Sequence, residues 1–353
     1  MPRGWIYTCI AATLFSGSLM ADTSLSPTDT PWKATVEYLH FKPFITDTYF
    51  VINRGTRNSF PIVAIGGQEQ NNVFNYHGGA RVGLAYEYCD GLSQASLTYT
   101  RLETESCRRI EDNDPTFPVL SPTNGPASWS TSELRFVNAM ESCLDFLYQR
   151  GDLMFERKVY CDCDLTLSVG VGVEAAELRL NSAFNTEDPE EDGHLRYRSR
   201  TDGIGPQLML GATYNIFDHS CFTDHDFCRI PGRLDIKVRL GGSLLVGSTE
   251  SSIFSDFTSN LGNFPPTISS DNQSHRSRRM IPVLHTRVGI RWETCFCNAP
   301  IGFEVGYELS NYYRAITEII YPSDFSALSF SPTRNLYKNL GLAGLYLSAS
   351  VNF

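Results

Sequence analysis

Histidines and cysteines are the residues of this sequence with the widest choice of chemistry. The chain contains ten cysteines and seven histidines. His219, Cys221, His225 and Cys228 stand close together and offer imidazole and thiolate groups, which are zinc ligands. Their spacing matches no established zinc pattern, so zinc is an alternative and the prediction is that the chain binds no metal.

Disulfide formation is the chemistry that we predict for most cysteines. Cys161 and Cys163 are separated by one residue, as are Cys295 and Cys297, and this spacing favours more distant partners over an internal bridge. Removal of Cys9 with a signal peptide leaves an odd number, which implies a free thiol or a bridge between molecules. Zinc binding and free thiols stay open as alternatives. The disulfide candidates are Cys89, Cys161, Cys163, Cys221, Cys228, Cys295 and Cys297.

No group of residues forms a recognisable catalytic or cofactor motif. The sequence has no Gly-x-Ser-x-Gly, no His-Glu-x-x-His and no Gly-x-x-x-x-Gly-Lys. We therefore predict that the chain is not an enzyme and has no cofactor. The histidines considered as partners for serines or acids are His40, His77, His194, His275 and His285.

A further set of residues is suited to act on solutes, because positive and negative side chains share one phase of alternating segments. Rings of mixed charge inside a pore filter solutes by size and charge. The alternative is that these groups pair across a plugged lumen. The pore-lining candidates are Lys33, Glu37, Arg81, Glu87, Glu174, Asp235, Lys237, Arg239, Arg287, Arg291, Glu304 and Glu308.

The elements that must position these charges are β-strands. From Leu165 to Ala175 apolar residues alternate strictly with Thr, Ser, Gly and Glu. This period of two is that of a strand, and a strand that crosses an outer membrane shows about 9–11 such residues. The turn Cys89-Asp-Gly91 between two alternating runs predicts a hairpin. Similar runs occur at 32–41, 80–88, 95–99, 206–216, 234–241, 284–292, 302–309 and 339–353.

The fold class predicted is all-β, a transmembrane antiparallel β-barrel of at least 10 strands, or of 12 to 16 if runs at 49–51 and 62–65 also cross. Residues 134–160 count once, although a shift of apolar phase near Gly151 predicts a bulge or two strands. An even number places both termini in the periplasm. All seven disulfide candidates then lie on the periplasmic side, unlike Cys107 and Cys143. Long extracellular loops are expected near 42–77, 103–133, 181–203, 247–281 and 314–338.

The two ends of the chain predict export to the outer membrane. Arg3, the apolar run 5–15 and the small residues before Ala21 predict a signal peptide over 1–21, which leaves a barrel over 22–353. The last strand alternates up to Phe353, as in strands recognised by the barrel-assembly machinery. A net charge of −10 argues against a nucleic-acid surface.

Short stretches of glycine and alternating apolar residues recur in a fixed order along the chain. They are Trp32–Tyr38, Gly79–Leu84, Leu97–Thr100, Gly203–Pro206, Gly242–Gly247, Val288–Trp292, Gly306–Glu308 and Gly341–Ser348 leading to Phe353. Together they resemble the Legionella-type major outer membrane proteins and their relatives in chlamydiae and chlamydia-like bacteria. The resemblance implies an integral, porin-like protein of the bacterial outer membrane. The cysteines fit the chlamydial branch, whose envelope proteins are crosslinked by disulfides.

The function predicted is passive diffusion of small hydrophilic solutes through an outer-membrane channel that disulfides tie into the envelope. The alternative is a non-conducting structural or adhesive barrel at the surface, and a soluble exported β-sandwich is a third reading. Expected partners are outer-membrane lipid, the barrel-assembly machinery, disulfide partners in the envelope and further copies in a homo-oligomer.

Overall fold

The computed structural model describes residues 31–45, 49–53, 68–71, 73–111, 120–122, 139–162, 164–187, 191–218, 232–259, 267–296, 299–320 and 334–353. The predicted signal peptide over 1–21, the run at 62–65 and the candidates Cys163, Cys221, Cys228 and Cys297 lie outside these residues.

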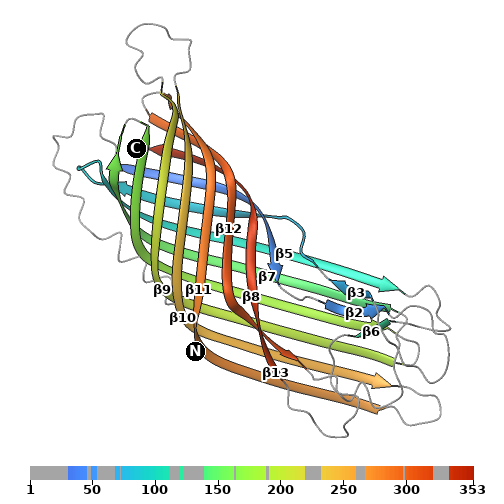
Figure 1. The fold of residues 1–353 in the computed structure, drawn as a ribbon. Coiled ribbons are helices and arrows are strands. Elements are labelled where there is room, and N and C mark those ends of the chain that lie inside the picture. The colour runs from blue at the N-terminus through green and yellow to red at the C-terminus, as the bar shows by residue number, and fades with distance from the viewer. Residues whose placement is uncertain are drawn as a thin grey trace.

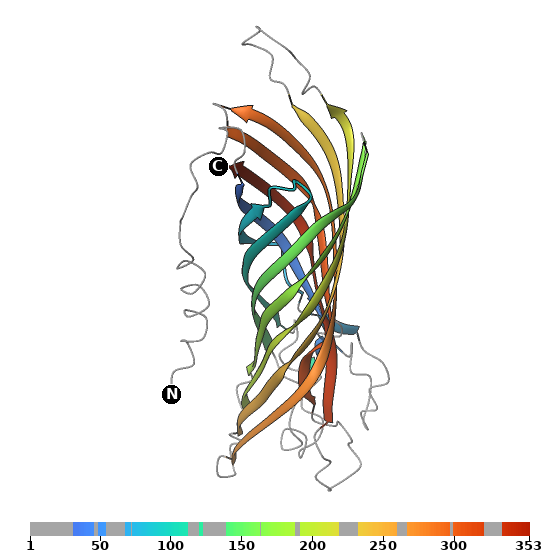
Figure 2. The ribbon, with the colours of Figure 1, turned by 90° about the vertical axis from the view of Figure 1, so that its left-hand side faces the viewer.

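Ten strands form a closed antiparallel barrel in the described part of the chain, in the ring order β1-β13-β12-β11-β10-β9-β8-β7-β5-β4. The predicted fold class and minimum strand number are confirmed, and the ring has none of the extra strands that would make 12 to 16. Figures 1 and 2 show the strands running obliquely along a tall, narrow wall. The wall strands are β1 (Trp32–Ile45), β4 (His77–Glu87), β5 (Ser93–Glu111), β7 (Ala139–Cys161), β8 (Leu165–Glu187), β9 (Glu191–Asp218), β10 (Arg233–Ser259), β11 (Thr267–Phe296), β12 (Ala299–Ile320) and β13 (Arg334–Asn352).

The first and last strands close the ring. β1 pairs with β13 from Lys33 opposite Asn352 to Ile45 opposite Leu340. At its edge the Trp32 amide donates to the Phe353 carbonyl (3.2 Å) and the Phe353 amide to the Trp32 carbonyl (2.8 Å). Closure gives each wall strand a hydrogen-bonded neighbour on both sides, as a lipid environment requires. We call the end where β1 begins and β13 ends the terminal end, and the opposite end the loop end.

A small sheet formed by β2 (Tyr49–Asn53), β3 (Gln68–Asn71) and β6 (Leu120–Pro122) lies at the loop end, in the order β3-β2-β6. The run at 49–51, considered as an extra crossing, belongs to this sheet and not to the wall. The sheet joins segments from two connections of the barrel.

Two of the expected loops are wrong in their extent. Paired wall strands run to Glu187 and from Glu191, and again to Ser259 and from Thr267, so most of 181–203 and 247–281 is wall. Parts of 42–77, 103–133 and 314–338 also belong to β1, β5, β12 and β13. The reason is visible in β9: beyond the apolar part of the strand Leu195 and Tyr197 face inward while Arg196 and Arg198 face outward, the reverse of the pattern sought.

The apolar phase of β7 does not mark a bulge at Gly151 or a second strand. Even-numbered residues from Met140 to Met154 all face inward, and pairing with β5 is continuous along the strand. The phase changes because the interior is lined by Leu144, Phe146 and Tyr148 in one half and by charged residues in the other. The register shift of β7 against β8 lies between Lys158 and Tyr160.

The outward face of the wall carries an apolar band. Exposed apolar residues occupy alternate positions on all ten strands, where lipid chains can cover them. At the terminal end aromatic rings follow one another, with centroids 5.0 Å apart for Trp32 and Tyr86 and 5.3 Å apart for Tyr86 and Tyr88. Such aromatic girdles are typical of a membrane interface. The band includes Val36, Tyr38, Val82, Leu97, Tyr99, Leu153, Val169, Val171, Val173, Ile204, Leu208, Leu210, Ile236, Leu240, Leu244, Val246, Leu284, Val288, Ile290, Val305, Tyr307, Leu345 and Leu347.

The predicted hairpin turn between β4 and β5 is held by Asp90. Its carboxylate accepts hydrogen bonds from the Ser93 hydroxyl (2.8 Å) and from the amides of Ser93 (2.9 Å) and Leu92 (3.0 Å). These donors, the Ser93 hydroxyl first, hold the pKa of Asp90 below its ordinary value. Gly91 takes the positive φ of 61° that the turn needs.

We expect Asp90→Ala to lower the heat-unfolding midpoint of the refolded barrel slightly at pH 7. Because the pKa of Asp90 is lower in the folded state, its ionised carboxylate stabilises the folded state above the pKa of the unfolded chain, about 4. This contribution is lost as the pH falls through the pKa of the folded state. The gap between wild type and variant, followed by the heat-induced gel shift, is therefore expected to narrow near pH 2. A gap of equal size at both pH values would contradict this role.

Candidate functional site in the barrel interior

A polar cavity occupies the half of the barrel interior nearer the terminal end. Its volume is about 190 Å³. Its lining extends from Lys33 and Ser350, close to the terminal ends of β1 and β13, inward to Arg150 and His285. The inward-facing charges of the wall line this cavity.

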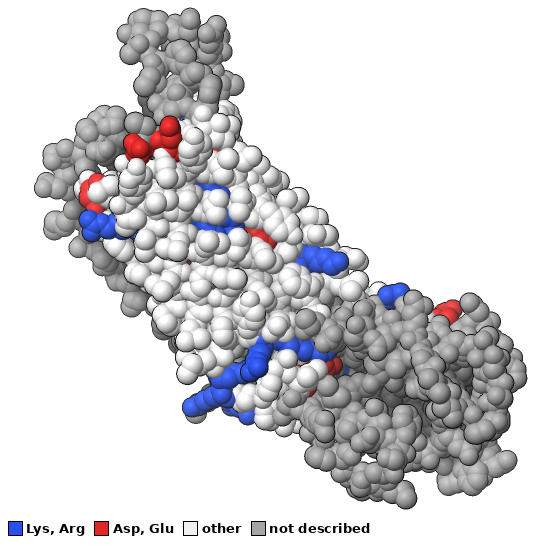
Figure 3. All heavy atoms as spheres, in the orientation of Figure 1, with Lys and Arg blue, Asp and Glu red and all other residues white. Residues whose placement is uncertain are grey.

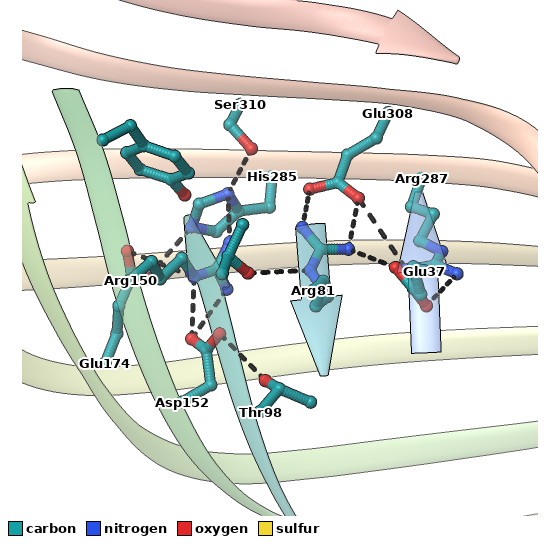
Figure 4. Close-up of polar contacts among 12 residues, drawn as sticks. Glu37, Arg81, Thr98, Arg150, Asp152, Glu174, His285, Arg287, Glu308 and Ser310 are labelled. Carbon is teal, nitrogen blue, oxygen red and sulfur yellow. Dashed lines mark hydrogen bonds and ion pairs between the residues drawn. The ribbon is translucent and has the colours of Figure 1, made fainter. Parts of the chain in front are cut away.

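Four charged residues form a compact group across the cavity (Figure 4). The Arg81 guanidinium donates to the Glu308 carboxylate at 2.7 and 2.8 Å and to the Glu37 carboxylate at 2.9 Å. Arg287 donates to Glu37 at 2.8 and 3.0 Å. These residues come from β4, β12, β1 and β11, so the ion pairs tie together strands that are not all neighbours. Bidentate Arg–carboxylate pairs of this kind are among the strongest polar contacts in proteins.

Glu304 extends this group through an aromatic ring. It accepts from Arg287 at 3.0 Å and from the Tyr346 hydroxyl at 2.7 Å, and the Arg287 guanidinium lies 3.7 Å from the centre of the Tyr346 ring. The tyrosine fits because Gly289 and Gly306 lack side chains: a Cβ at either position would come within 2.1 or 2.5 Å of its hydroxyl. The glycines of β11 and β12 therefore make room for the aromatic ring beside the ion pairs.

A second charged group centres on Glu174, which is fully buried. Its carboxylate accepts from the Tyr312 hydroxyl at 3.0 Å and contacts His285 Nε2 at 3.0 Å and Arg150 Nε at 3.6 Å. Arg150 also pairs with Asp152 at 2.8 Å. Because Glu174 lies on β8 and its partners on β7, β11 and β12, this group also spans the interior.

His285 links a serine to a carboxylate, as a hydrolytic triad does, but the arrangement differs. Ser310 Oγ lies 2.8 Å from His285 Nδ1 while Nε2 faces Glu174. Arg150 lies 3.0 Å from the same Nδ1, and since a guanidinium can only donate, that nitrogen accepts. Ser310 is 1% exposed and does not line the cavity. Ser310, His285 and Glu174 therefore form a buried polar network that joins strands across the interior.

An apolar cluster fills the interior on the loop side of these charges, and one member, Tyr346, reaches back among them. Its members come from every wall strand except β4, among the described residues, and from Phe74 just before β4. The Phe74 and Phe146 rings are 6.0 Å apart, and those of Tyr148 and Tyr312 are 5.9 Å apart with hydroxyls at 3.0 Å. We call this set the closing cluster: Leu39, Phe41, Phe74, Leu102, Leu144, Phe146, Tyr148, Ala176, Leu178, Leu180, Tyr197, Leu245, Ile281, Val283, Tyr312, Ala315, Ile316, Leu340, Leu342 and Tyr346.

The predicted pore-lining residues fall into two groups. Glu174 and Asp235 face inward but are buried outside the cavity lining, and Asp235 pairs with Arg233 at 2.8 Å. Glu87 is exposed at the end of β4, where it contacts Lys158 at 3.3 Å. The prediction did not include Arg150, Asp152, Glu156 or the closing cluster, because the change of apolar phase near Gly151 left the inward face of β7 unassigned. The nine that line the cavity are Lys33, Glu37, Arg81, Lys237, Arg239, Arg287, Arg291, Glu304 and Glu308.

The cysteines are arranged differently from the prediction. Cys107 of β5 and Cys143 of β7 stand directly opposite one another and form a disulfide, although both were outside the candidate set. Cys89 and Cys161, two candidates, are exposed and free in the part of the chain that the structure describes. Cys295 lies in β11. Cross-strand pairing explains the bridge, since opposite residues of paired strands are close enough for one.

Neither a metal-ligand group nor a membrane-spanning helix occurs within the described residues. No group of three or more His, Cys, Asp or Glu side chains there could hold a metal ion. The cluster His219, Cys221, His225 and Cys228, considered for zinc, lies outside those residues. No helix of the described residues is long and apolar enough to cross a membrane.

Closed strand pairing, an apolar outer band and a polar interior define an integral β-barrel protein of the bacterial outer membrane. The family described as Legionella pneumophila major outer membrane protein precursor matches residues 25–353. The chain belongs to this family, as the resemblance predicted. No curated protein matches the sequence.

Solved structures share the barrel architecture at low similarity. The outer membrane protease OmpT from Escherichia coli is 10% identical, with a TM-score of 0.40 and coverage of 94% of this chain and 100% of its own. The Ralstonia pickettii toluene transporter TbuX is 9% identical (TM-score 0.30, 92% and 90% covered). A Pseudomonas aeruginosa FadL homologue is 10% identical (TM-score 0.27, 95% and 96% covered). These likenesses carry no statement about what this chain acts on.

Proposed function

We propose that the protein is an outer-membrane channel for small hydrophilic solutes that is closed at rest by the closing cluster. The observation that carries the proposal is the water-accessible cavity of about 190 Å³, which charged residues line from opposite walls. Apolar constrictions stop ions by excluding water and open when they widen. No catalytic step and no cofactor form part of this proposal.

The charges nearest the terminal end favour small anions. Lys33 and Lys237 have no ion pair or hydrogen bond among the described residues, and Arg239 and Arg291 line the same cavity. Arg239 contacts Glu156 at 3.7 Å, and Arg291 contacts Glu293 at 2.9 Å. In the described part of the chain, the whole cavity lining carries seven Lys and Arg side chains against five Asp and Glu side chains, and this excess of positive charge sets the preference.

Single-channel recording of the refolded protein in planar bilayers tests the channel. We expect brief openings between long closed periods, and a reversal potential in a KCl gradient that indicates preference for chloride. The variant Lys33→Gln/Lys237→Gln is expected to reduce that preference roughly fivefold, because two charges about 4 Å apart in water interact by about 1 kcal/mol. Lys158→Gln, which removes an exposed lysine outside the cavity lining, serves as control. An unchanged preference in the double variant would contradict the assignment.

The second candidate function is a non-conducting structural or adhesive barrel, and the closing cluster is the observation that favours it. Exposed free thiols at Cys89 and Cys161, both beside terminal-end turns, would crosslink such a barrel to envelope partners or to a second copy. Non-reducing gels of intact envelopes test this, with Cys89→Ser/Cys161→Ser expected to lose high-mass bands. Silence in bilayers together with those bands would favour the structural function over the channel.

The remaining partners follow from the same surfaces. We infer that outer-membrane lipid covers the apolar band. We also infer that the barrel-assembly machinery recognises Phe353, which is 58% exposed at the end of the last strand. Phe353→Ser is expected to reduce the amount of folded barrel in the outer membrane of cells without altering the stability of barrel refolded in detergent.

A further inference from the structure

Arginines replace apolar residues on the outward face of three strands, directly beyond the apolar band. On β9 the outward positions are apolar from Ile204 onward, and toward the loop end they become Asp202, Arg200, Arg198 and Arg196. On β11 they change from Met280 to Arg278 and Arg276, and on β8 they reach Arg179. These changes from apolar residues to arginines on β8, β9 and β11 lie close together on one side of the barrel.

Strand pairing gathers these arginines into one patch. Arg179 of β8 is opposite Arg200 of β9, Arg200 is opposite Glu250 of β10, and Glu250 is opposite Arg276 of β11. Strands lie about 4.8 Å apart and same-face neighbours on one strand about 6.6 Å apart. In Figure 3 basic side chains gather along the lower edge of the wall, where β11 runs toward the loop end, while the middle of the wall is almost free of charge. We call Arg179, Arg196, Arg198, Arg200, Arg276 and Arg278 the arginine patch.

Half of the arginine patch is already neutralised by carboxylates. Glu177 pairs with Arg179 and, at 2.9 Å, with Arg200; Arg200 also contacts Asp202 at 3.1 Å. Arg276 contacts Glu250 at 3.2 Å.

The other half has no such partner. Arg196, Arg198 and Arg278 form no ion pair or hydrogen bond within the described residues, and all three are exposed. Three uncompensated guanidinium groups therefore stand at the border where the lipid-facing surface ends.

We propose that the arginine patch binds the phosphate groups of anionic lipid headgroups in the leaflet at the loop end. A phosphate at the bilayer interface is a fixed anion at the depth where the apolar band stops, and arginine donors match its oxygens in bidentate fashion. Basic side chains at a charged leaflet gain about 1 kcal/mol each. The bilayer holds lipid phosphates at that depth and holds neither soluble phosphate nor a protein there. We therefore identify lipid as the ligand of the arginine patch. The inference is independent of conduction.

The test is lipid retention by purified barrel. Refolded protein is offered lipid A with two phosphates, its monophosphoryl form and phosphatidylcholine, and retained lipids are counted by native mass spectrometry. We expect retention of the bisphosphorylated lipid at least tenfold above phosphatidylcholine, with the monophosphoryl form between, and a decline as salt rises. Arg196→Gln/Arg198→Gln is expected to reduce that retention on the order of tenfold, and Arg196→Lys/Arg198→Lys to restore part of it.

The matched control is Arg101→Gln/Arg109→Gln, which also removes two exposed arginines from one strand, at sites paired with Glu103 and Glu111. It is expected to retain lipid as wild type does, and the heat-induced gel shift verifies that each variant is folded. Equal retention of phosphorylated and zwitterionic lipid, an equal loss in the control, or full displacement by millimolar inorganic phosphate would overturn the proposal.

Discussion

Phe146→Ala/Tyr148→Ala is expected to convert a rarely conducting barrel into one with frequent, stable current steps. Both side chains are about 1% exposed and face the interior from β7, within the closing cluster. Their removal takes away two aromatic rings that meet Phe74 and Tyr312 from the opposite side. Water can then enter the constriction, since a wider apolar segment no longer excludes it.

The control is Phe155→Ala on the same strand. Phe155 faces outward and is 42% exposed, so its loss alters lipid contact without widening the interior. Each buried aromatic truncation costs about 3–5 kcal/mol of stability, so the double variant is expected to unfold at lower temperature and must be checked for folding before recording. Folded, inserted double variant that stays silent would show that closure does not depend on this cluster.

The part of the barrel within the apolar band could be predicted from sequence because lipid and water impose opposite demands on alternate residues. Val171 and Val173 must face lipid, which leaves Glu174 to the interior. The same rule identified inward charges such as Arg81 and Glu308. Their partners could not be read, because an ion pair across the lumen depends on ring order and register, and neither is visible in one sequence.

Beyond the apolar band the rule reverses, and this is where the prediction of loops was wrong. On β9 Leu195 and Tyr197 face the interior while Arg196 and Arg198 face outward, as in a barrel surrounded by water. A search for apolar residues on the outer face reads such a strand as a polar loop. The closing cluster was missed for the same reason, since its strands place apolar residues inside.

The Cys107–Cys143 bridge shows a different limit. Cys143 lies in a segment that was predicted as a strand, whereas Cys107 lies in residues 103–133, which were predicted as a loop. The β5–β7 register brings the two together. A sequence separation of 36 residues carries no sign of that register. The expected clustering of thiols at the terminal end still holds for Cys89 and Cys161, which are free and exposed there.

Arg81→Met is expected to destabilise the barrel by about 3–5 kcal/mol, because removal of one partner leaves buried charges uncompensated. Glu37 and Glu308, both about 5% exposed, would then share Arg287, which contacts them at 2.8 and 3.8 Å. The double variant Arg81→Met/Glu308→Met removes an opposite pair and is expected to be more stable than the sum of the single changes predicts, by about 0.5–3 kcal/mol for contacting residues.

Urea unfolding of the refolded barrel in lipid vesicles measures these differences. Arg101→Gln is the control, because Arg101 and Glu103 are 55% and 70% exposed at 3.1 Å and such pairs contribute about 1 kcal/mol or less. If Arg81→Met unfolds at the same urea concentration as the control, the charges across the lumen are solvated and the interior is wetter than the closed arrangement implies. A large loss with strong coupling to Glu308 would instead make the ion pairs a structural clamp, so that any open state must keep Arg81, Glu37, Glu308 and Arg287 together and widen at the closing cluster alone.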